Sequence, residues 1–345
     1  MKRTVKVGNV LMGGGTVSVQ SMTTVKTSDV EKSVAQILAL EAAGCDVARV
    51  AVSDEADAYA LRSVADGVHI PVVADVHFSA KLAVLAVENG ASKLRINPGN
   101  IGGEREIALV ADCVKAHGVP VRVGANTGSI EKHFLERYGR SAEALVGSAL
   151  YNAEILEKHG VHDIVLSVKA SDVPLTVEAY TMLAERCGYP LHLGVTEAGT
   201  EEMGVVKSSI GIGSLLLKGI GDTIRVSLSA DPVKEVYAAH DILRACGLEK
   251  DYVEVVSCPT CGRCRYDCIG LAERVNARVR TVRKKLKVAV MGCVVNGPGE
   301  AKGCDLGIAG GEEYCVIMRK ERENERVAKE DAERVFFARL DELIG

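Results

Sequence analysis

The fold is decided by residues 72–97, which read VVADVHFSAKLAVLAVENGASKLRIN. The run Val72–Phe78 is valine-rich and short enough for one buried strand, and Lys93–Asn97 is a second candidate strand. Between them, Ala80–Glu88 has the apolar spacing of an amphipathic helix, and Gly90 follows it as a helix C-terminus favours. A strand, a helix and a strand in such quick succession predict parallel pairing.

The same alternation continues on both sides of this unit. We expect eight strands, at Val17–Met22, Asp46–Val52, Val72–Phe78, Lys93–Asn97, Val121–Asn126, Asp163–Ser171, Leu191–Glu197 and Thr223–Ser229. Further helices are predicted at Asp29–Ala43, Glu106–His117, Ala142–His159, Val177–Arg186 and Val233–Ala245. Eight such units in about 230 residues have the number and size of a (β/α)8 TIM barrel. An open doubly wound sheet is the alternative, although it usually carries fewer strands.

The pattern changes after Gly247. A strand is expected at Tyr252–Val256, a helix at Leu271–Lys285 and a strand at Lys287–Val295. Two short strands and a helix follow, at Leu306–Ala309, Tyr314–Arg319 and Arg326–Leu343. This order predicts a small α+β domain. We therefore expect a substrate-binding barrel at residues 1–247 and a second domain at residues 252–345, joined by the linker Leu248–Asp251.

Composition narrows the class of protein. The chain has 345 residues, of which 47% are hydrophobic, so it can bury a sizeable core. Aromatic residues make up 4%, Trp is absent and the net charge is −4, which argues against nucleic acid as a partner. No signal peptide and no run of 18 apolar residues is found, so we expect a cytoplasmic protein without a membrane partner. In that reducing compartment the 11 cysteines are expected to be metal ligands or small core residues rather than disulfides.

Charged residues in the predicted barrel strands indicate the site. Because outward strand faces pack on helices, charged side chains must point into the barrel or cap its end. Near the carboxyl ends of the strands this inward set contains Arg49, Asp75, His77, Arg95, Asn97, Arg122, Asn126, Ser167, Lys169, His192, Thr196, Arg225 and Ser227. Glu197 lies just past its strand. Active sites of TIM barrels lie at this end, and five cations with few carboxylates there predict a diphosphate site.

Several of these residues have an alternative interpretation. Any one arginine could pair with Asp75 or Glu197 to close the barrel, whereas burying all five cations without a ligand is too costly. His77 and His192 are either structural or catalytic. Glu197 is either a general acid beside the bound anion or an ion-pair partner of Lys169 or Arg225. The glycine-rich run 207–213 suits phosphate binding or helix packing equally.

A cysteine cluster marks the second domain. Cys258, Cys261, Cys264 and Cys268 have the C-x2-C-x2-C-x3-C spacing of a bacterial ferredoxin run. The pair Cys258 and Cys261 with Cys293 and Glu300 is a second possible set, of three thiolates and one carboxylate. No His occurs in the last hundred residues to complete a Cys3His zinc site, so an iron-sulfur cluster is favoured. Spacing alone does not choose between the two ligand sets.

Six motifs carry a resemblance to a known family. They are Ser257–Arg263 (SCPTCGR), Met291–Glu300 (MGCVVNGPGE), Gly219–Ser229, Gln20–Met22 (QSM), Ala74–Phe78 (ADVHF) and Arg95–Asn100 (RINPGN). Taken in their order along the chain, over nearly its whole length, they resemble the bacterial 4-hydroxy-3-methylbut-2-enyl diphosphate synthases. One departure is that Cys264 and Cys268 fall where the family usually has other residues.

The resemblance implies a two-domain enzyme of non-mevalonate isoprenoid synthesis. Its reaction would be the reductive ring opening of 2-C-methyl-D-erythritol 2,4-cyclodiphosphate with loss of water. A [4Fe-4S] cluster would be held by Cys258, Cys261, Cys293 and Glu300. The diphosphate would be held by Arg49, Arg95, Arg122 and Lys169 with Asn126, and Glu197 would take part in protonation.

The resemblance also implies partners. Electrons would come from flavodoxin or ferredoxin, in agreement with the lack of a G-x-G-x-x-G nucleotide fingerprint after any strand. The short linker makes it hard for the second domain to reach its own barrel. The resemblance implies a homodimer in which each cluster domain caps the other subunit's barrel.

Two other classes of protein share parts of this pattern. A pteroate-synthase-like barrel transferase with a structural zinc domain would keep the phosphate site. A zinc-dependent nucleic-acid-binding module would use the basic run Arg278–Lys285, although such a run is usually a solvated helix face.

Overall fold

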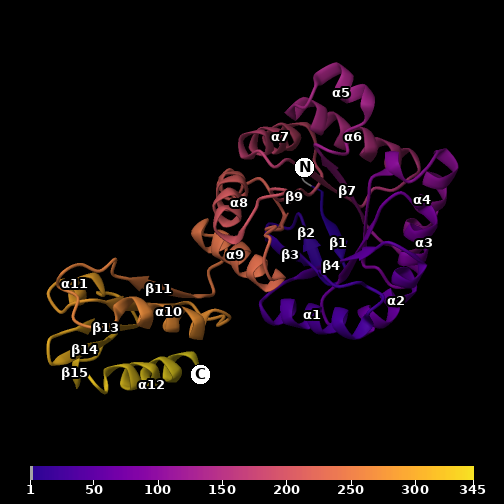
Figure 1. Cartoon of the computed structure of the whole chain (residues 1–345). Coiled ribbons are helices and arrows are strands. Elements are labelled where there is room, and N and C mark those ends of the chain that lie inside the picture. The colour runs from indigo at the N-terminus through magenta and orange to yellow at the C-terminus, as the bar shows by residue number, and fades with distance from the viewer. Residues whose placement is uncertain (1–2) are drawn as a thin grey trace. The chain divides into compact units, whose positions relative to one another are not determined.

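The structure is a computed structural model that describes residues 3–345. It consists of two compact units, residues 1–248 and residues 249–345, and each is described by itself. In the first unit, helices surround a ring of strands (Figure 1).

The barrel is built from eight parallel strands. They are β3 (Ser18–Met22), β4 (Val47–Val52), β5 (Val72–Val76), β6 (Lys93–Ile96), β7 (Val121–Asn126), β8 (Ile164–Lys169), β9 (His192–Leu193) and β10 (Thr223–Ile224). Their order in the sheet is β8-β7-β6-β5-β4-β3-β10-β9. A parallel bridge between Leu166 of β8 and Leu191, the residue before β9, joins the two ends of this order. The predicted TIM barrel is therefore confirmed.

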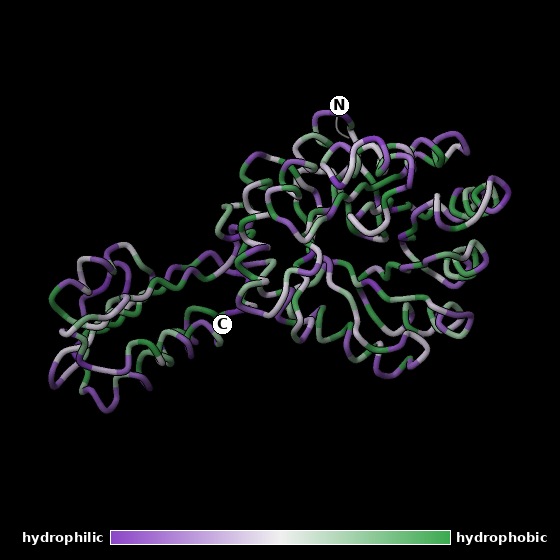
Figure 2. The backbone as a smooth tube through the Cα atoms, turned by 45° about the horizontal axis from the view of Figure 1, so that its top comes forward, coloured by the Kyte–Doolittle hydropathy of each residue, from purple (hydrophilic) through white to green (hydrophobic). Residues whose placement is uncertain are grey.

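Amphipathic helices cover the outside of the barrel. They are α1 (Val30–Ala42), α2 (Glu55–Asp66), α3 (Ala80–Glu88), α4 (Glu104–His117), α6 (Ala142–Lys158), α7 (Val173–Arg186), α8 (Glu201–Leu216) and α9 (Pro232–Ala245). Hydrophobic and hydrophilic residues alternate along them (Figure 2). Buried strand residues such as Val50, Ile96, Val123 and Val168 share one core with the helices, so the outward strand faces are apolar as predicted. The short α5 (Lys132–Tyr138) and the 3₁₀ turn η1 (Pro98–Asn100) lie in βα loops.

A hairpin closes the amino-terminal end of the barrel. Its strands are β1 (Val5–Val7) and β2 (Val10–Met12), which pair antiparallel. Val5, Val7 and Met12 pack against Val47, Val73 and Val165, which belong to β4, β5 and β8. Because this end is filled with apolar side chains, the opposite end is left for polar chemistry.

The second unit contains one mixed five-stranded sheet and helices. The sheet order is β11 (Val253–Ser257), β12 (Leu286–Met291), β13 (Leu306–Gly310), β14 (Tyr314–Arg319) and β15 (Glu325–Ala328). The strands β11, β12 and β13 pair parallel to one another. The strand β14 pairs antiparallel with β13 on one side and with β15 on the other. The helices are α10 (Cys268–Val279), α11 (Gly297–Glu300) and α12 (Ala332–Ile344).

The structure corrects several element boundaries. The helix predicted at Arg326–Leu343 was wrong at its start, because Glu325–Ala328 pairs with β14 and buries Val327. The strands predicted at Leu191–Glu197 and Thr223–Ser229 are regular for only two residues each, since the chain leaves the sheet to form loops at the barrel mouth. The prediction missed α2, α8 and the hairpin. No helix in residues 3–345 has both the length and the apolar composition needed to cross a membrane.

Candidate active site and cluster cavity

The carboxyl ends of the barrel strands surround a small cavity of about 100 Å³. The predicted Asn126 lines it. All five predicted cations line it too, and they are Arg49, Arg95, Arg122, Lys169 and Arg225. The hydroxyl residues Ser167, Thr196 and Ser227 line it as well. We call this set the barrel mouth. The lining residues come from β4, β6, β7 and β8 and from the segments that follow β9 and β10, which is how a TIM barrel gathers residues that lie far apart in sequence.

Asp75 neutralises part of this charge. Its carboxylate lies 3.3 Å from Nη1 of Arg95 and 3.5 Å from Nη2 of Arg49, and only 6% of the residue is exposed. Burial by itself would raise the pKa of Asp75, but Arg49, His77 and Arg95 outweigh it and hold that pKa well below its usual range. Burial lowers the pKa of Arg49 to about 10. Two arginines are thus fixed by one carboxylate, as the alternative interpretation allowed for single residues.

Arg122 and Lys169 have no such partner among their described contacts. Arg122 is 2% exposed, and its Nε and Nη1 atoms make no hydrogen bond. Burial, and then the neighbouring cations, lower the pKa of Lys169 well below its ordinary value. An unpartnered guanidinium at this depth is costly unless an anion binds. The mouth therefore has the composition of a site for a multiply charged anion.

Two glycines make room for these cations. A Cβ on Gly194 would lie 2.6 Å from Nζ of Lys169 and 2.8 Å from the carbonyl oxygen of Arg225. A Cβ on Gly124 would lie 3.2 Å from Nε of Arg95. Side chains at these positions would displace the cations that line the mouth.

His77 and Glu197 lie outside the cavity lining. Nε2 of His77 is 2.9 Å from Nη1 of Arg95, and half of the histidine side chain is exposed. Glu197 is exposed and follows Thr196, which lines the cavity. Its backbone has φ of 51°, a left-handed conformation that is uncommon for a residue other than glycine. Strained residues of this kind cluster at functional sites.

Two further ionisable side chains lie deeper in the barrel. Lys93 is fully buried, and its Nζ lies 3.5 Å from Oε1 of Gln20. His192 is also fully buried, its Nε2 makes no hydrogen bond, and burial followed by the nearby cations lowers its pKa well below the usual value. The structure places His192 in the core beneath the mouth, where it does not line the cavity.

A second cavity, of about 210 Å³, lies in the carboxyl-terminal unit. All four residues of the second predicted ligand set line it: Cys258, Cys261, Cys293 and Glu300. Cys258 and Cys261 come from the loop after β11, Cys293 from the loop after β12, and Glu300 from α11. Amide groups of Asn296 and then Val295 lower the pKa of the Cys293 thiol, which favours the thiolate form. We call this the cluster cavity.

Cys264 and Cys268 do not line the cluster cavity. The Cys264 thiol donates to the carbonyl oxygen of Tyr266 at 3.2 Å. Cys268, the first residue of α10, is 1% exposed, and burial raises the pKa of its thiol to about 11. Both thiols therefore lie among core residues of this unit.

The donor set of the cluster cavity suits a [4Fe-4S] cluster. Three soft thiolates and a carboxylate are donors that iron-sulfur clusters accept, and all four residues line one cavity. Across residues 3–345, no three His, Cys, Asp or Glu side chains converge on one position as a single metal ion requires.

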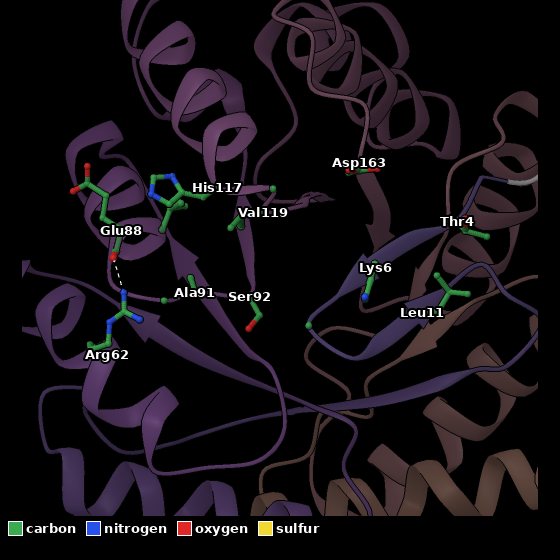
Figure 3. Close-up of a pocket in the computed structure, with 14 residues that line it drawn as sticks. Thr4, Lys6, Leu11, Arg62, Glu88, Ala91, Ser92, His117, Val119 and Asp163 are labelled. Carbon is green, nitrogen blue, oxygen red and sulfur yellow. Dashed lines mark hydrogen bonds between the residues drawn. The ribbon is translucent and has the colours of Figure 1, made fainter.

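A larger hollow lies at the opposite end of the barrel from the mouth (Figure 3). Lys6 and Leu11 of the hairpin form one side, and Arg62 and His117 form the other. Arg62 donates to the carbonyl oxygen of Glu88 at 2.9 Å. Its charged side chains are exposed, so it lacks the buried, unpartnered groups that distinguish the mouth.

Two residues near the mouth were missed from the sequence. Met22 lies between two of the cations, with its sulfur 3.0 Å from Nε of Arg49 and 3.5 Å from Nη1 of Arg225. Glu235 of α9 is 4% exposed and contacts Arg225. Glu235 was detectable, because it is a charged residue on the apolar stripe that contains Ala239 and Ile242. Met22 gave no such signal.

Comparison with known proteins covers both units. Residues 2–240 match the family model described as the GcpE TIM-barrel domain, and residues 254–342 match that of the GcpE protein C-terminal domain. A protein of Caldanaerobacter subterraneus subsp. tengcongensis is 56% identical over 93% of this chain and 91% of its own length. One from Desulfotalea psychrophila is 51% identical over 99% of this chain and 95% of its own length. Both are named 4-hydroxy-3-methylbut-2-en-1-yl diphosphate synthase (flavodoxin).

Two solved structures resemble about 70% of this chain. A truncated 3-deoxy-D-arabino-heptulosonate 7-phosphate synthase from Thermotoga maritima has a TM-score of 0.52 at 16% identity, covering 71% of this chain and 94% of its own. A dihydropteroate synthase from Stenotrophomonas maltophilia has a TM-score of 0.51 at 16% identity, covering 70% of this chain and 96% of its own. These likenesses concern the fold, so they do not favour the pteroate-synthase alternative. By its two family domains and its relatives, the chain belongs to the bacterial 4-hydroxy-3-methylbut-2-en-1-yl diphosphate synthases.

Proposed function

We propose that this chain converts 2-C-methyl-D-erythritol 2,4-cyclodiphosphate to (E)-4-hydroxy-3-methylbut-2-enyl diphosphate in isoprenoid biosynthesis. The reaction takes up two electrons and two protons. It opens the ring at a carbon–oxygen bond and releases one hydroxyl as water. The observation that carries the proposal is the mouth itself, where five cations line one small cavity and Arg122 lacks hydrogen-bond partners. A cyclic diphosphate supplies the negative charge and the oxygen acceptors that these groups need.

The barrel residues bind and orient this substrate. Arg122 and Lys169 provide the charge that Asp75 does not neutralise, and Arg49 and Arg95 are held in place by that carboxylate. Asn126 offers an amide beside them. Fixing the diphosphate in this way orients the carbon ring before electrons arrive.

Glu197 is the proposed proton donor. It is an exposed carboxyl beside Thr196, at the rim of a cationic cavity. His77 holds Arg95 from the same rim rather than reacting. A group at this position can deliver a proton to a leaving oxygen while the diphosphate stays bound below it.

The cluster cavity is the proposed site of the cofactor. Cys258, Cys261, Cys293 and Glu300 would hold a [4Fe-4S] cluster, which supplies electrons one at a time when bound. Glu300 is exposed and is the one hard ligand in the set, so it is the ligand that substrate could replace most readily.

The proposal includes partners and a compartment. Flavodoxin is the proposed electron donor, as in the names of the relatives, with ferredoxin as the alternative. We propose a homodimer in which the cluster domain of one subunit caps the barrel of the other, because the reaction needs both sites together. The 11 free cysteines and the cluster suit the reducing cytoplasm.

Anaerobic purification tests the proposal. We expect a brown protein with about four irons per chain that forms the product, identified by mass spectrometry, when reduced flavodoxin is supplied. A colourless zinc protein without turnover would instead support the transferase alternative, which the relatives do not favour.

Paired variants test the ligand set. Cys264→Ser should keep its iron and Glu300→Ala should weaken iron binding. Loss of the cluster in Cys264→Ser, with full retention in Glu300→Ala, would contradict the assignment.

A further inference from the structure

Glu235 links the barrel mouth to the helix layer behind it. One of its carboxylate oxygens, Oε2, accepts a hydrogen bond from Oγ of Ser21 at 3.0 Å and lies 3.4 Å from Nε of Arg225. The other, Oε1, accepts from the amide of Leu228 at 3.0 Å. The three partners belong to β3, to the end of β10 and to the loop that leads from β10 to α9.

The position of Glu235 is unusual for a carboxylate. It is 4% exposed on the buried face of α9, opposite Ser21, which is itself fully buried. Outward strand positions of a barrel are normally apolar, so a serine and a glutamate facing each other there need a reason beyond packing.

Arg225 provides that reason. Its Nε contacts the carboxylate of Glu235 and its Nη1 contacts the sulfur of Met22. The guanidinium is therefore held at both ends beside the cavity. The amide contact at Leu228 fixes the far end of the loop that carries Ser227, another lining residue. With Asp75 fixing Arg49 and Arg95, Glu235 is the second carboxylate that sets the position of a cation at the mouth.

We propose that Glu235 is a positioning residue, which orients Arg225 and the Ser227 loop and so sets the affinity of the mouth for the cyclic diphosphate. The inference rests on the proposed function. A charge-assisted hydrogen bond restricts a guanidinium more strongly than a neutral one, so the charge of Glu235 is what the site requires.

Glu235→Gln isolates that charge. The amide oxygen can still accept from the Leu228 amide, and the amide nitrogen can donate to Ser21, so the loop contacts persist while Arg225 loses its partner. We expect KM and the calorimetric Kd for the cyclic diphosphate to rise about tenfold, with kcat within about twofold. In an Arg225→Met background the same change should alter KM less than about twofold, because its target is gone.

Asp57 supplies a matched control. It is a 1% exposed carboxylate in the first turn of α2, and it accepts the backbone amides of Ser28 at 2.9 Å and Ser53 at 3.1 Å. Asp57 anchors loops between strands and helices as Glu235 does, but it has no ion pair with a cation of the mouth among its described contacts. Asp57→Asn should lower the thermal stability and leave KM unchanged.

The outcomes separate the two proposals. A wild type that does not bind the cyclic diphosphate overturns both. A wild type that binds, with Glu235→Gln indistinguishable from it, overturns only the role of Glu235. The same holds if Glu235→Gln raises KM equally with and without Arg225, or if Asp57→Asn raises it as much.

Discussion

The barrel mouth and the cluster cavity differ in how deeply their functional side chains are buried. At the mouth Arg95 and Arg122 are buried and the other three cations are half-buried. The Nε and Nη1 atoms of Arg122, a residue with 2% exposure, make no hydrogen bond. At the cluster cavity Cys258 and Cys293 are half-buried, while Cys261 and Glu300 are exposed. The barrel fold therefore keeps its charges in place before substrate arrives, at a cost in stability. The cluster loops leave their ligands accessible, so the cofactor can enter and complete them.

The largest expected effect tests whether the two regions are independent. Cys293→Ser should abolish turnover and reduce bound iron, because it removes a ligand whose backbone surroundings favour the thiolate. Iron analysis and the visible spectrum measure the loss. The barrel should still unfold at an unchanged temperature, and a barrel that loses stability along with the iron would show that the two regions are coupled.

Removing a cation from the mouth comes next. Arg122→Met should weaken binding of the cyclic diphosphate at least about a hundredfold, since a buried charge-assisted contact is lost. The same variant should be more stable without ligand by about 1–3 kcal/mol, because an uncompensated buried charge is replaced by an apolar side chain of similar length. Denaturant unfolding measures this. A less stable variant would mean that Arg122 is satisfied in the free protein.

A smaller effect is expected where the mouth is crowded. Gly194→Ala places a methyl group 2.6 Å from Nζ of Lys169 and 2.8 Å from the carbonyl oxygen of Arg225, so KM should rise about tenfold as these groups move. Steady-state kinetics measures the change. Gly213→Ala serves as the control, because the nearest atom to a Cβ at that position in α8 is the sulfur of Cys246, at an ordinary contact distance of 3.7 Å. Equal kinetics in both variants would show that Lys169 can shift without loss.

A further expected effect is a pH dependence of the stability of the barrel. Burial and neighbouring cations lower the folded-state pKa values of Lys93 and Lys169, so the unfolded chain binds more protons than the folded chain. Stability should therefore rise with pH from the lowered pKa values up to about 10.4, by at most about 1.4 kcal/mol per pH unit for each proton. Denaturant unfolding at about pH 7 and pH 9 measures this. The double variant Lys93→Met/Lys169→Met should lose the rise, and a stability that falls with pH in the wild type would contradict the account.

The same comparison explains what could be predicted from the sequence. The barrel and its inward charges followed from strand periodicity, since Arg49, Arg95 and Arg122 occupy alternate positions within valine-rich runs. The spacing of the cysteines pointed to a cluster but left two ligand sets, because Cys264 and Cys268 also suit the core. In the structure Cys264 and Cys268 do not line the cavity, whereas Cys293, which follows another strand, does.

Contacts between distant segments could not be predicted. Ser21 and Glu235 are separated by 214 residues, and nothing local pairs them. The hairpin that closes the barrel has only three residues in each strand, too few for a periodic signal. Val327 forms a strand rather than a helix because β14 offers it a partner, which local propensity does not contain.

Calorimetric titration of full-length Cys293→Ser with 2-C-methyl-D-erythritol 2,4-cyclodiphosphate tests the central claim most directly, because it measures the mouth without the cluster. We predict one ligand per chain, with an affinity within about threefold of the wild type, and binding at least about a hundredfold weaker after Arg122→Met. Loss of binding in Cys293→Ser, or unchanged binding in Arg122→Met, would contradict the claim that the barrel mouth alone holds the diphosphate.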